Sequence, residues 1–239
     1  MTQTAPSEPH LQPDDRAMAI RDQLRDAIVE HRLVPGTKLS EAEVGKLFDV
    51  SRTVVRAALQ SLSFEGLVRA ERNRGAFVAS PSPEEARQLF EARRQIEAGI
   101  ARIAAERARH ADFIRFDACL EAETRLLQER GPASRRAAIR ASGEFHILLA
   151  EVAGNAIMQR FMEELIARSS LVIALYGRTG ASSCGHNEHG EIVAALRDRD
   201  PDRAIRLVLI HIDHIEADLD LRGTNGLPLA DALNLRAST

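Results

Sequence analysis

The sequence predicts a mainly α-helical protein: an N-terminal winged helix-turn-helix of three helices and a β-hairpin wing, joined to an all-α helical bundle. Apolar residues recur at helical spacing over most of the chain, whereas a strand-like pattern occurs at 67–78 around a polar turn. A Ser-Pro-Ser-Pro run at 80–83 is a stiff linker that marks the boundary. We expect a disordered leader (1–16), the winged helix-turn-helix (17–80), the bundle (84–222) and a C-terminal tail (223–239).

Composition and charge limit the classes of protein to which the chain can belong. It has 239 residues, of which 44% are hydrophobic, which is ample for buried cores. The longest strongly apolar stretch, 171–176, is far shorter than the roughly 20 residues of a membrane span, and the polar leader lacks the pattern of a signal peptide. Two cysteines without paired spacing indicate neither a disulfide framework nor a zinc ribbon. We therefore expect a globular, cytoplasmic protein with no membrane partner.

Two helices are predicted in the first 50 residues. Apolar residues at helical spacing begin at Met18, and this first helix should end before a Pro-Gly turn. Ser40 and, three residues later, Glu43 form a capping box, which starts a short second helix. Its Val44 and Leu47 are predicted to face the core.

A third helix carries arginines on its outer face. Ser51 is a suitable N-cap, and Arg52 and Arg56 lie four residues apart, opposite an apolar face. Two short helices in this succession are typical of a helix-turn-helix whose second helix enters the major groove of DNA. For an isolated pair of arginines, a solvated helix face would be the more common explanation. The apolar face consists of Val54, Val55, Ala58, Leu59 and Leu62.

The segment around this helix is basic, although the whole chain carries a net charge of −3. Between Lys46 and Ala76, six basic residues stand against three acidic ones, a balance that favours phosphate binding. The pattern at 67–78 predicts a two-stranded hairpin in which Gly75 supplies the positive φ of the turn. Such a wing can lay Arg74 against the minor groove or a phosphate.

The run VPGTKLSEAEVGKLFDVSRTVVRAALQSLSFEGLVRAERNRGAFV resembles the DNA-binding domain of the GntR family of bacterial transcription regulators. The likeness includes the Pro-Gly turn, the Ser-Arg-Thr start of the third helix, the Glu-Gly-Leu-Val exit and the Arg-Gly wing tip. Two positions depart from the family pattern, because Val54 replaces the usual proline and Ala57 the usual glutamate, which puts the base preference in question. The resemblance implies an operator of double-stranded DNA and contacts to it from Ser51, Arg52, Thr53, Arg56, Arg74 and Gly75.

Three histidines occupy predicted inward positions on separate helices of the bundle. His146, His189 and His211 each share a helical stripe with apolar residues. A single inward histidine is more often a satisfied core residue than a ligand. Three of them can instead coordinate a divalent transition ion such as zinc and leave positions open for a ligand.

Residues 84–222 resemble the all-helical FCD effector domain of one GntR subfamily, through EFHILLAEVAGN, the Glu-His-Gly-Glu-Ile motif and a histidine 22 positions after the second. The resemblance implies a bound divalent metal (zinc, nickel or manganese) with His146, His189 and His211 as ligands. Ser142 stands where the family has an aspartate ligand, so three histidines alone would hold the metal, or the cavity would bind an organic acid directly. Arg93 matches the family's Arg-x-x-(Leu/Ile)-Glu pattern and implies a carboxylate contact, with an ion pair to Glu97 as the alternative.

Together these features predict a ligand-responsive DNA-binding regulator. We expect a repressor that binds a palindromic operator as a homodimer, paired through the C-terminal domain, and that a small organic acid releases. The alternative is a metal-dependent enzyme with a DNA-binding module, since three histidines with an open position resemble catalytic zinc. That alternative lacks a general base, because Glu144 and Glu188 are both predicted to point away from the histidines. We therefore expect no catalysis.

Overall fold

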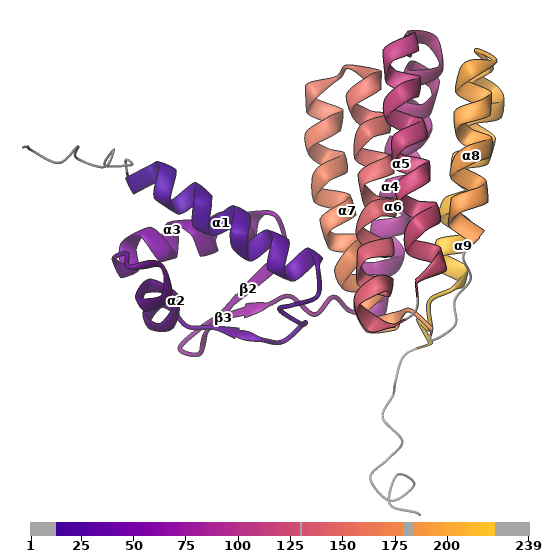
Figure 1. Cartoon of the computed structure of the whole chain (residues 1–239). Helices are drawn as coiled ribbons and strands as arrows, with labels where there is room; N and C mark the ends of the chain where they lie inside the picture. The colour runs from indigo at the N-terminus through magenta and orange to yellow at the C-terminus, as the bar shows by residue number, and fades with distance from the viewer. Residues whose placement is uncertain (1–12, 130, 179–183, 223–239) are drawn as a thin grey trace, which may run out of the picture.

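The computed structural model describes residues 13–129, 131–178 and 184–222. The predicted tail at 223–239 and most of the predicted leader lie outside these ranges. The first helix begins at Pro13, so the last four residues assigned to the leader are helical. Figure 1 shows the N-terminal helices and hairpin on one side of an upright helical bundle, with α7 the bundle helix on the side of α1.

From Pro13 onward, the N-terminal domain contains three helices and a small sheet. β1 pairs with β3 and β3 with β2, both antiparallel, in the order β1-β3-β2. The hairpin is the predicted wing, whereas the two-residue strand β1 is too short to leave an alternating pattern in the sequence. The elements are α1 (Pro13–Val29), β1 (Lys38–Leu39), α2 (Glu41–Phe48), α3 (Arg52–Phe64), β2 (Val68–Glu71) and β3 (Gly75–Val78).

Helical spacing identified most of this domain's core correctly. The apolar face predicted for α3 is buried except at Val54, which is half-buried, and Ile20, Leu24 and Ile28 of α1 are buried as well. The prediction for Leu47 is wrong, because its side chain is 76% exposed while Val44 is buried. The helix α2 has only two turns, and its Val44 and Phe48, one turn apart, occupy the packing face, so Leu47 is left on the solvent side.

Among the described residues, six helices form the second domain. Their starts follow the capping signals in the sequence: the Ser82 side chain accepts from Glu85 N, and Asp200 accepts from Arg203 N one residue before a proline. The last helix ends at Ala217, and Leu219 then forms a β-bridge with Gly177. The helices are α4 (Pro83–Arg107), α5 (His110–Gln128), α6 (Pro132–Ala153), α7 (Ala156–Tyr176), α8 (Cys184–Arg197) and α9 (Pro201–Ala217).

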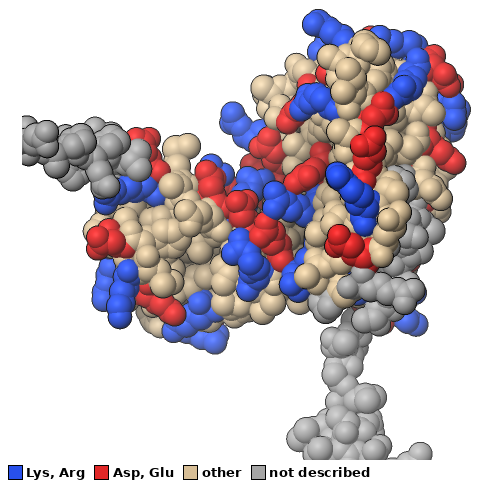
Figure 2. All heavy atoms as spheres, in the orientation of Figure 1, with Lys and Arg blue, Asp and Glu red and all other residues tan. Residues whose placement is uncertain are grey.

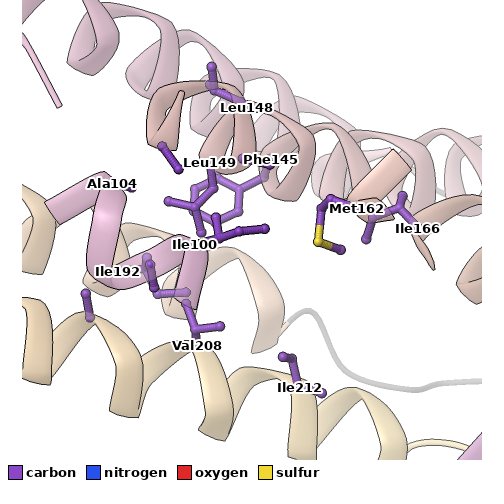
Figure 3. Packing of buried hydrophobic residues seen from close by; sticks show 14 of the residues in the cluster. Ile100, Ala104, Phe145, Leu148, Leu149, Met162, Ile166, Ile192, Val208 and Ile212 are labelled. Carbon is purple, nitrogen blue, oxygen red and sulfur yellow. The ribbon is translucent and has the colours of Figure 1, made fainter. Parts of the chain in front are cut away.

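The bundle encloses one apolar core, to which every one of these helices contributes. Figure 3 shows part of it, where Ile100, Phe145 and Ile192 come together from α4, α6 and α8. Burial of this apolar surface is the main force that holds the six helices in register. Within the described ranges, no helix is long and apolar enough to cross a membrane.

The two domains share a packed interface between α7 and the winged helix-turn-helix. Ala167 and Leu171 of α7 are buried in the apolar cluster of the N-terminal domain. Arg168 Nε donates to the carbonyl oxygen of Glu65, at 2.8 Å. Gly66 has a φ of +74°, a conformation that residues with a Cβ rarely adopt, so glycine is favoured at this exit from α3. Figure 2 shows acidic and basic side chains interspersed along this boundary.

Candidate functional site

The predicted DNA-contacting residues of the third helix lie on one open surface. Ser51 is the N-cap of α3 in extended conformation, although its side chain makes no capping hydrogen bond. Arg52 and Thr53 follow in the first turn and are exposed. The N-terminal end of α3 therefore presents side chains with hydrogen-bond donors to solvent, as a recognition helix must.

The side chain of Arg56 is fixed by a carboxylate on the neighbouring helix. Arg56 Nε and Nη2 donate to the two carboxylate oxygens of Glu41 at 2.9 and 2.8 Å. The hydrogen bond from this guanidinium lowers the pKa of Glu41, so the carboxyl is ionised. The family pattern has a glutamate where this chain has Ala57. Here the carboxylate of Glu41 on α2 contacts Arg56. This two-pronged pair leaves the Nη1 edge of the guanidinium directed away from Glu41.

The wing places its arginine at the tip of the hairpin. Arg74 pairs with Glu71 and lies over the ring of Phe77, 5.5 Å from its centroid. Its side chain is 71% exposed. Gly75 has a φ of +101°, as predicted, and Asn73 also adopts a positive φ of +63°. The hairpin thus needs two left-handed residues, one more than the sequence suggested.

The three predicted histidines meet in the core of the bundle. His146, His189 and His211 are 2%, 0% and 1% exposed, which confirms their predicted inward position. His211 Nε2 lies 3.1 Å from His146 Nε2 and 3.1 Å from His189 Nε2. One ligand atom from each of the three lies within 4.8 Å of the others. Helices α6, α8 and α9 therefore bring three imidazoles to one point.

Each of these imidazoles contacts a carboxylate through its other nitrogen. His146 Nδ1 lies 2.6 Å from Glu97 Oε2. The corresponding contact for His189 is Glu123, at 2.9 and 3.0 Å from its two oxygens, and for His211 it is Glu188, at 2.8 Å. A carboxylate behind the second ring nitrogen is the arrangement that orients histidine ligands around metals. The ring of Phe145 also stacks on His189, with 3.9 Å between centroids.

These contacts fix the protonation of the rings. Burial lowers the pKa of His146 and of His211 to about 4, so both imidazoles are neutral near pH 7. Burial alone would raise the pKa of Glu97, but Arg93 and His146 lower it well below its ordinary range. The ionised carboxylates of Glu97 and Glu188 can only accept, so the protons of His146 and His211 lie on Nδ1 and their Nε2 lone pairs are free. The Nε2 atoms of His146 and His211 consequently meet without a proton between them, and His189 Nε2 approaches the same His211 atom.

This donor set fits a divalent transition metal. Zinc–nitrogen bonds of about 2.1 Å at ordinary bond angles place ligand nitrogens about 3.0–3.4 Å apart, which matches the 3.1 Å separations. Neutral imidazoles are the form that binds metal, and a cation between them removes the repulsion of the lone pairs. Ser142 lies one helical turn before His146 and offers a neutral hydroxyl, so the three histidines are the strong donors. The residues present therefore fit a metal held by three nitrogen ligands.

Arg93 forms the ion pair to Glu97 that was the alternative reading of its sequence pattern. It is 1% exposed, and its Nε donates to Glu97 Oε1 at 2.6 Å. Its Nη1 lies 3.4 Å from Ser169 Oγ, while Nη2 is buried with no hydrogen-bond partner among the described residues. A buried guanidinium nitrogen without an acceptor costs free energy. The guanidinium of Arg93 is therefore suited to donate hydrogen bonds to an anionic ligand.

A cavity of about 200 Å³ lies beside this arginine. Arg93, Ser142 and His146 line it, together with Ser169 and Ser170 of α7. His146, the arginine and the hydroxyls thus line one cavity, and His146 connects it to the other two histidines. The remaining lining consists of isoleucines of α6, α7 and α9, residues of α1, and the charged side chains of Arg140, Glu144 and Glu163 with Gly143 and Ala167.

The carboxylates behind His189 and His211 are functional candidates that the sequence analysis missed. Glu123 is 5% exposed and follows Phe116 and Leu120 on the inward stripe of α5. An acidic residue on this apolar face of the helix could have indicated a buried carboxylate. Glu188 was expected to point away from the histidines, and the structure corrects this. It diverges from its neighbour His189 but reaches His211 on α9, and it also contacts the exposed His214. Spacing within one helix could not show a partner on another.

Comparison with known proteins identifies both domains. Residues 16–78 match the model of bacterial regulatory proteins of the gntR family, and residues 88–214 match the FCD domain. The chain is 31% identical to the HTH-type transcriptional repressor RspR of Escherichia coli over 196 residues, which cover 80% of this chain and 83% of that protein. It is 27% identical to the Uxu operon transcriptional regulator of the same bacterium over 222 residues, 82% and 83% of the two chains.

Solved structures agree with this assignment. A transcriptional regulator from Rhodococcus sp. RHA1, described as GntR, superposes with a TM-score of 0.73 at 26% identity and covers 84% of this chain and 96% of its own. E. coli McbR/YncC has the same fold, with a TM-score of 0.74 at 16% identity, over 84% and 95% of the two chains. The chain therefore belongs to the GntR family of bacterial regulators, in the group with an FCD domain, and is a ligand-responsive DNA-binding regulator rather than an enzyme.

Proposed function

We propose that this protein is a repressor that binds a palindromic operator through the N-terminal end of α3 and the wing. The support is the open surface at which the donors gather, with Arg56 oriented by Glu41. Side chains in the first turns of a recognition helix reach base edges, whereas wing residues contact the minor groove or phosphates. Relatives named as transcriptional repressors favour repression over activation. The residues we assign to operator contacts are Ser51, Arg52, Thr53, Arg56, Arg74 and Gly75.

Two copies of the chain would read the two halves of such an operator. We assign the pairing surface to the C-terminal domain, where Ile157 and Phe161, one turn apart on α7, are 69% and 50% exposed. Exposed apolar side chains of this size are commonly covered in an assembly. A regulator of this kind acts where the chromosome lies, so we place it in the cytoplasm.

The effector domain would hold a zinc, nickel or manganese ion through His146, His189 and His211. A metal held by three neutral histidines keeps its positive charge and open positions for an acidic ligand. Glu97, Glu123 and Glu188 would orient the three rings. Ser142 would contribute no charge, so the site is more positive than one with an aspartate in that place.

The effector would be a small organic acid. The observation that carries this proposal is Arg93, whose Nη2 is buried without an acceptor beside a cavity that His146 also lines. A carboxylate placed there would satisfy the guanidinium and face the histidine cluster. The cavity volume of about 200 Å³ is below the range typical of drug-sized ligands, which favours a small metabolite.

The test combines metal analysis with a ligand screen. Elemental analysis of protein purified without added metal should find one transition ion per chain, and this ion should be lost in His211→Ala. In a thermal-shift screen of acetate, lactate, malate and citrate, at least one acid should raise the unfolding temperature of the wild-type chain. Arg93→Lys should reduce that shift, whereas Arg102→Lys, at an exposed position of the same helix, should keep it. A shift unchanged in Arg93→Lys would contradict the assigned effector site.

A further inference from the structure

The cavity beside Arg93 is not enclosed by the effector domain alone. Four residues of α1 in the winged helix-turn-helix also line it: Arg25, Asp26, Val29 and Glu30. Helices α6 and α7 provide the opposite walls, and Arg93 of α4 lies among them. We propose that α1 is one wall of the effector site, so that an acid bound at Arg93 touches the DNA-binding domain directly.

The chemistry of the cavity is suited to a ligand that spans both domains. Arg93 and three serines supply donors, and the side chains of Ile139, Ile166 and Val29 are apolar neighbours. Because the cavity is small, an acid anchored on Arg93 has little room to bind without also contacting α1. This step rests on the proposed function in one respect, namely that the effector is an acid held by Arg93.

The contacts that hold α1 against the bundle surround the same cavity. Arg25 Nη2 donates to the carbonyl oxygen of Glu163 at 3.0 Å, and Glu30 pairs with Arg140 of α6. Each of these four residues also lines the cavity. A ligand in this space therefore lies among the links between the domains, where its presence can strengthen or displace them.

Helix α1 also connects this wall to the recognition helix. Ile20 and Leu24 of α1 are buried in the same apolar cluster as Leu59 and Leu62 of α3. Arg21 Nη1 donates to Glu65 at the end of α3, at 3.2 Å. Because packed helices move as a unit, a change in the position of α1 relative to α7 changes the position of α3 as well.

A ligand that contacts both domains binds best to one arrangement of them. If operator binding favours a different arrangement, ligand and DNA oppose each other, and each changes the affinity of the other by the same factor. A ligand enclosed by the bundle alone would lack this direct contact with α1. The proposal therefore predicts that substitutions on α1, outside the effector domain, alter effector affinity.

The experiment uses the full chain and titrates malate and citrate by calorimetry. Val29→Trp and Asp26→Trp place a bulky side chain on the α1 wall, the second at an exposed position where folding tolerates it. Gln23→Trp is the matched control on an exposed position of α1 that does not line the cavity. Arg93→Lys tests the proposed effector site independently of α1. The unfolding temperature of each variant shows that it is folded.

We expect the acid that binds the wild-type chain to bind about tenfold more weakly to Val29→Trp and Asp26→Trp, and equally well to Gln23→Trp. Its effect on affinity for an operator duplex, selected from a random library, should be lost in the same two variants. If Arg93→Lys weakens binding but both α1 variants keep wild-type affinity, the shared wall is wrong and the proposed effector site stands. If Arg93→Lys keeps wild-type affinity, or neither acid binds the wild-type chain, the proposed effector site fails and the shared wall fails with it.

Discussion

Neutralising Glu123 should weaken metal binding without unfolding the bundle. The carboxylate of Glu123 accepts from His189 Nδ1 at 2.9 and 3.0 Å and is 5% exposed. Glu123→Gln keeps an acceptor oxygen of the same size but removes the negative charge that makes the imidazole a stronger donor to metal. Loss of such an outer partner typically costs about 10- to 100-fold in metal affinity. This corresponds to about 1.4–2.7 kcal/mol at 25 °C.

The assay is a competition titration in which the protein and a zinc-binding dye share a limiting amount of zinc. Glu121→Gln is the matched control, because Glu121 is exposed on the same helix, two residues away. The dissociation constant should rise about 10- to 100-fold in Glu123→Gln and stay at the wild-type value in Glu121→Gln. Equal zinc affinity in wild type and Glu123→Gln would refute the reasoning that carboxylates orient the three histidines.

Three further predictions concern DNA binding, pH and the domain boundary. Arg56→Ala should weaken binding to a selected operator duplex by about 1–3 kcal/mol in a gel-shift assay at fixed salt, with the unfolding temperature unchanged. In metal-stripped protein, the pKa of His146 and of His211 is about 4 when folded, below the unfolded value near 6.5, so the unfolded chain binds more protons between these values. The free energy of unfolding should therefore fall as pH decreases from about 6.5 to about 4, by roughly 2–4 kcal/mol per histidine in urea titrations, and a flat profile would exclude buried neutral imidazoles. Gly66→Ala should destabilise the fold by about 1 kcal/mol or more, because a φ of +74° strains a residue with a Cβ and that Cβ would displace the Arg168 guanidinium from the Glu65 carbonyl; wild-type stability would show that this position tolerates a side chain.

Local patterns were sufficient for the helices and for the faces that carry the main functional candidates. The inward position of His146, His189 and His211 follows from the period of the α-helix, since each shares a stripe with buried apolar residues. The apolar face of α3 follows in the same way, and it leaves Arg52 and Arg56 on the solvent side.

What the sequence could not show depends on contacts between helices distant in the chain. Glu123 and His189 are 66 residues apart, and neither position alone indicates the other as its partner. The same holds for Glu41, whose pairing with Arg56 requires the turn between α2 and α3 to be in place. The error at Leu47 has a related cause, because a two-turn helix offers too few residues to define its buried side.

The most direct test of the central claim, that an acid bound beside the histidine cluster controls DNA binding, is the operator dissociation constant measured at fixed salt with and without that acid. The operator is a duplex selected from a random library, and the acid is the one that raises the unfolding temperature in the screen. We predict at least a tenfold weaker affinity with saturating acid for the wild-type chain, and no change for Arg93→Lys, which should bind the operator normally in the absence of acid. An operator affinity that stays the same when the wild-type chain is saturated with the acid would contradict the account.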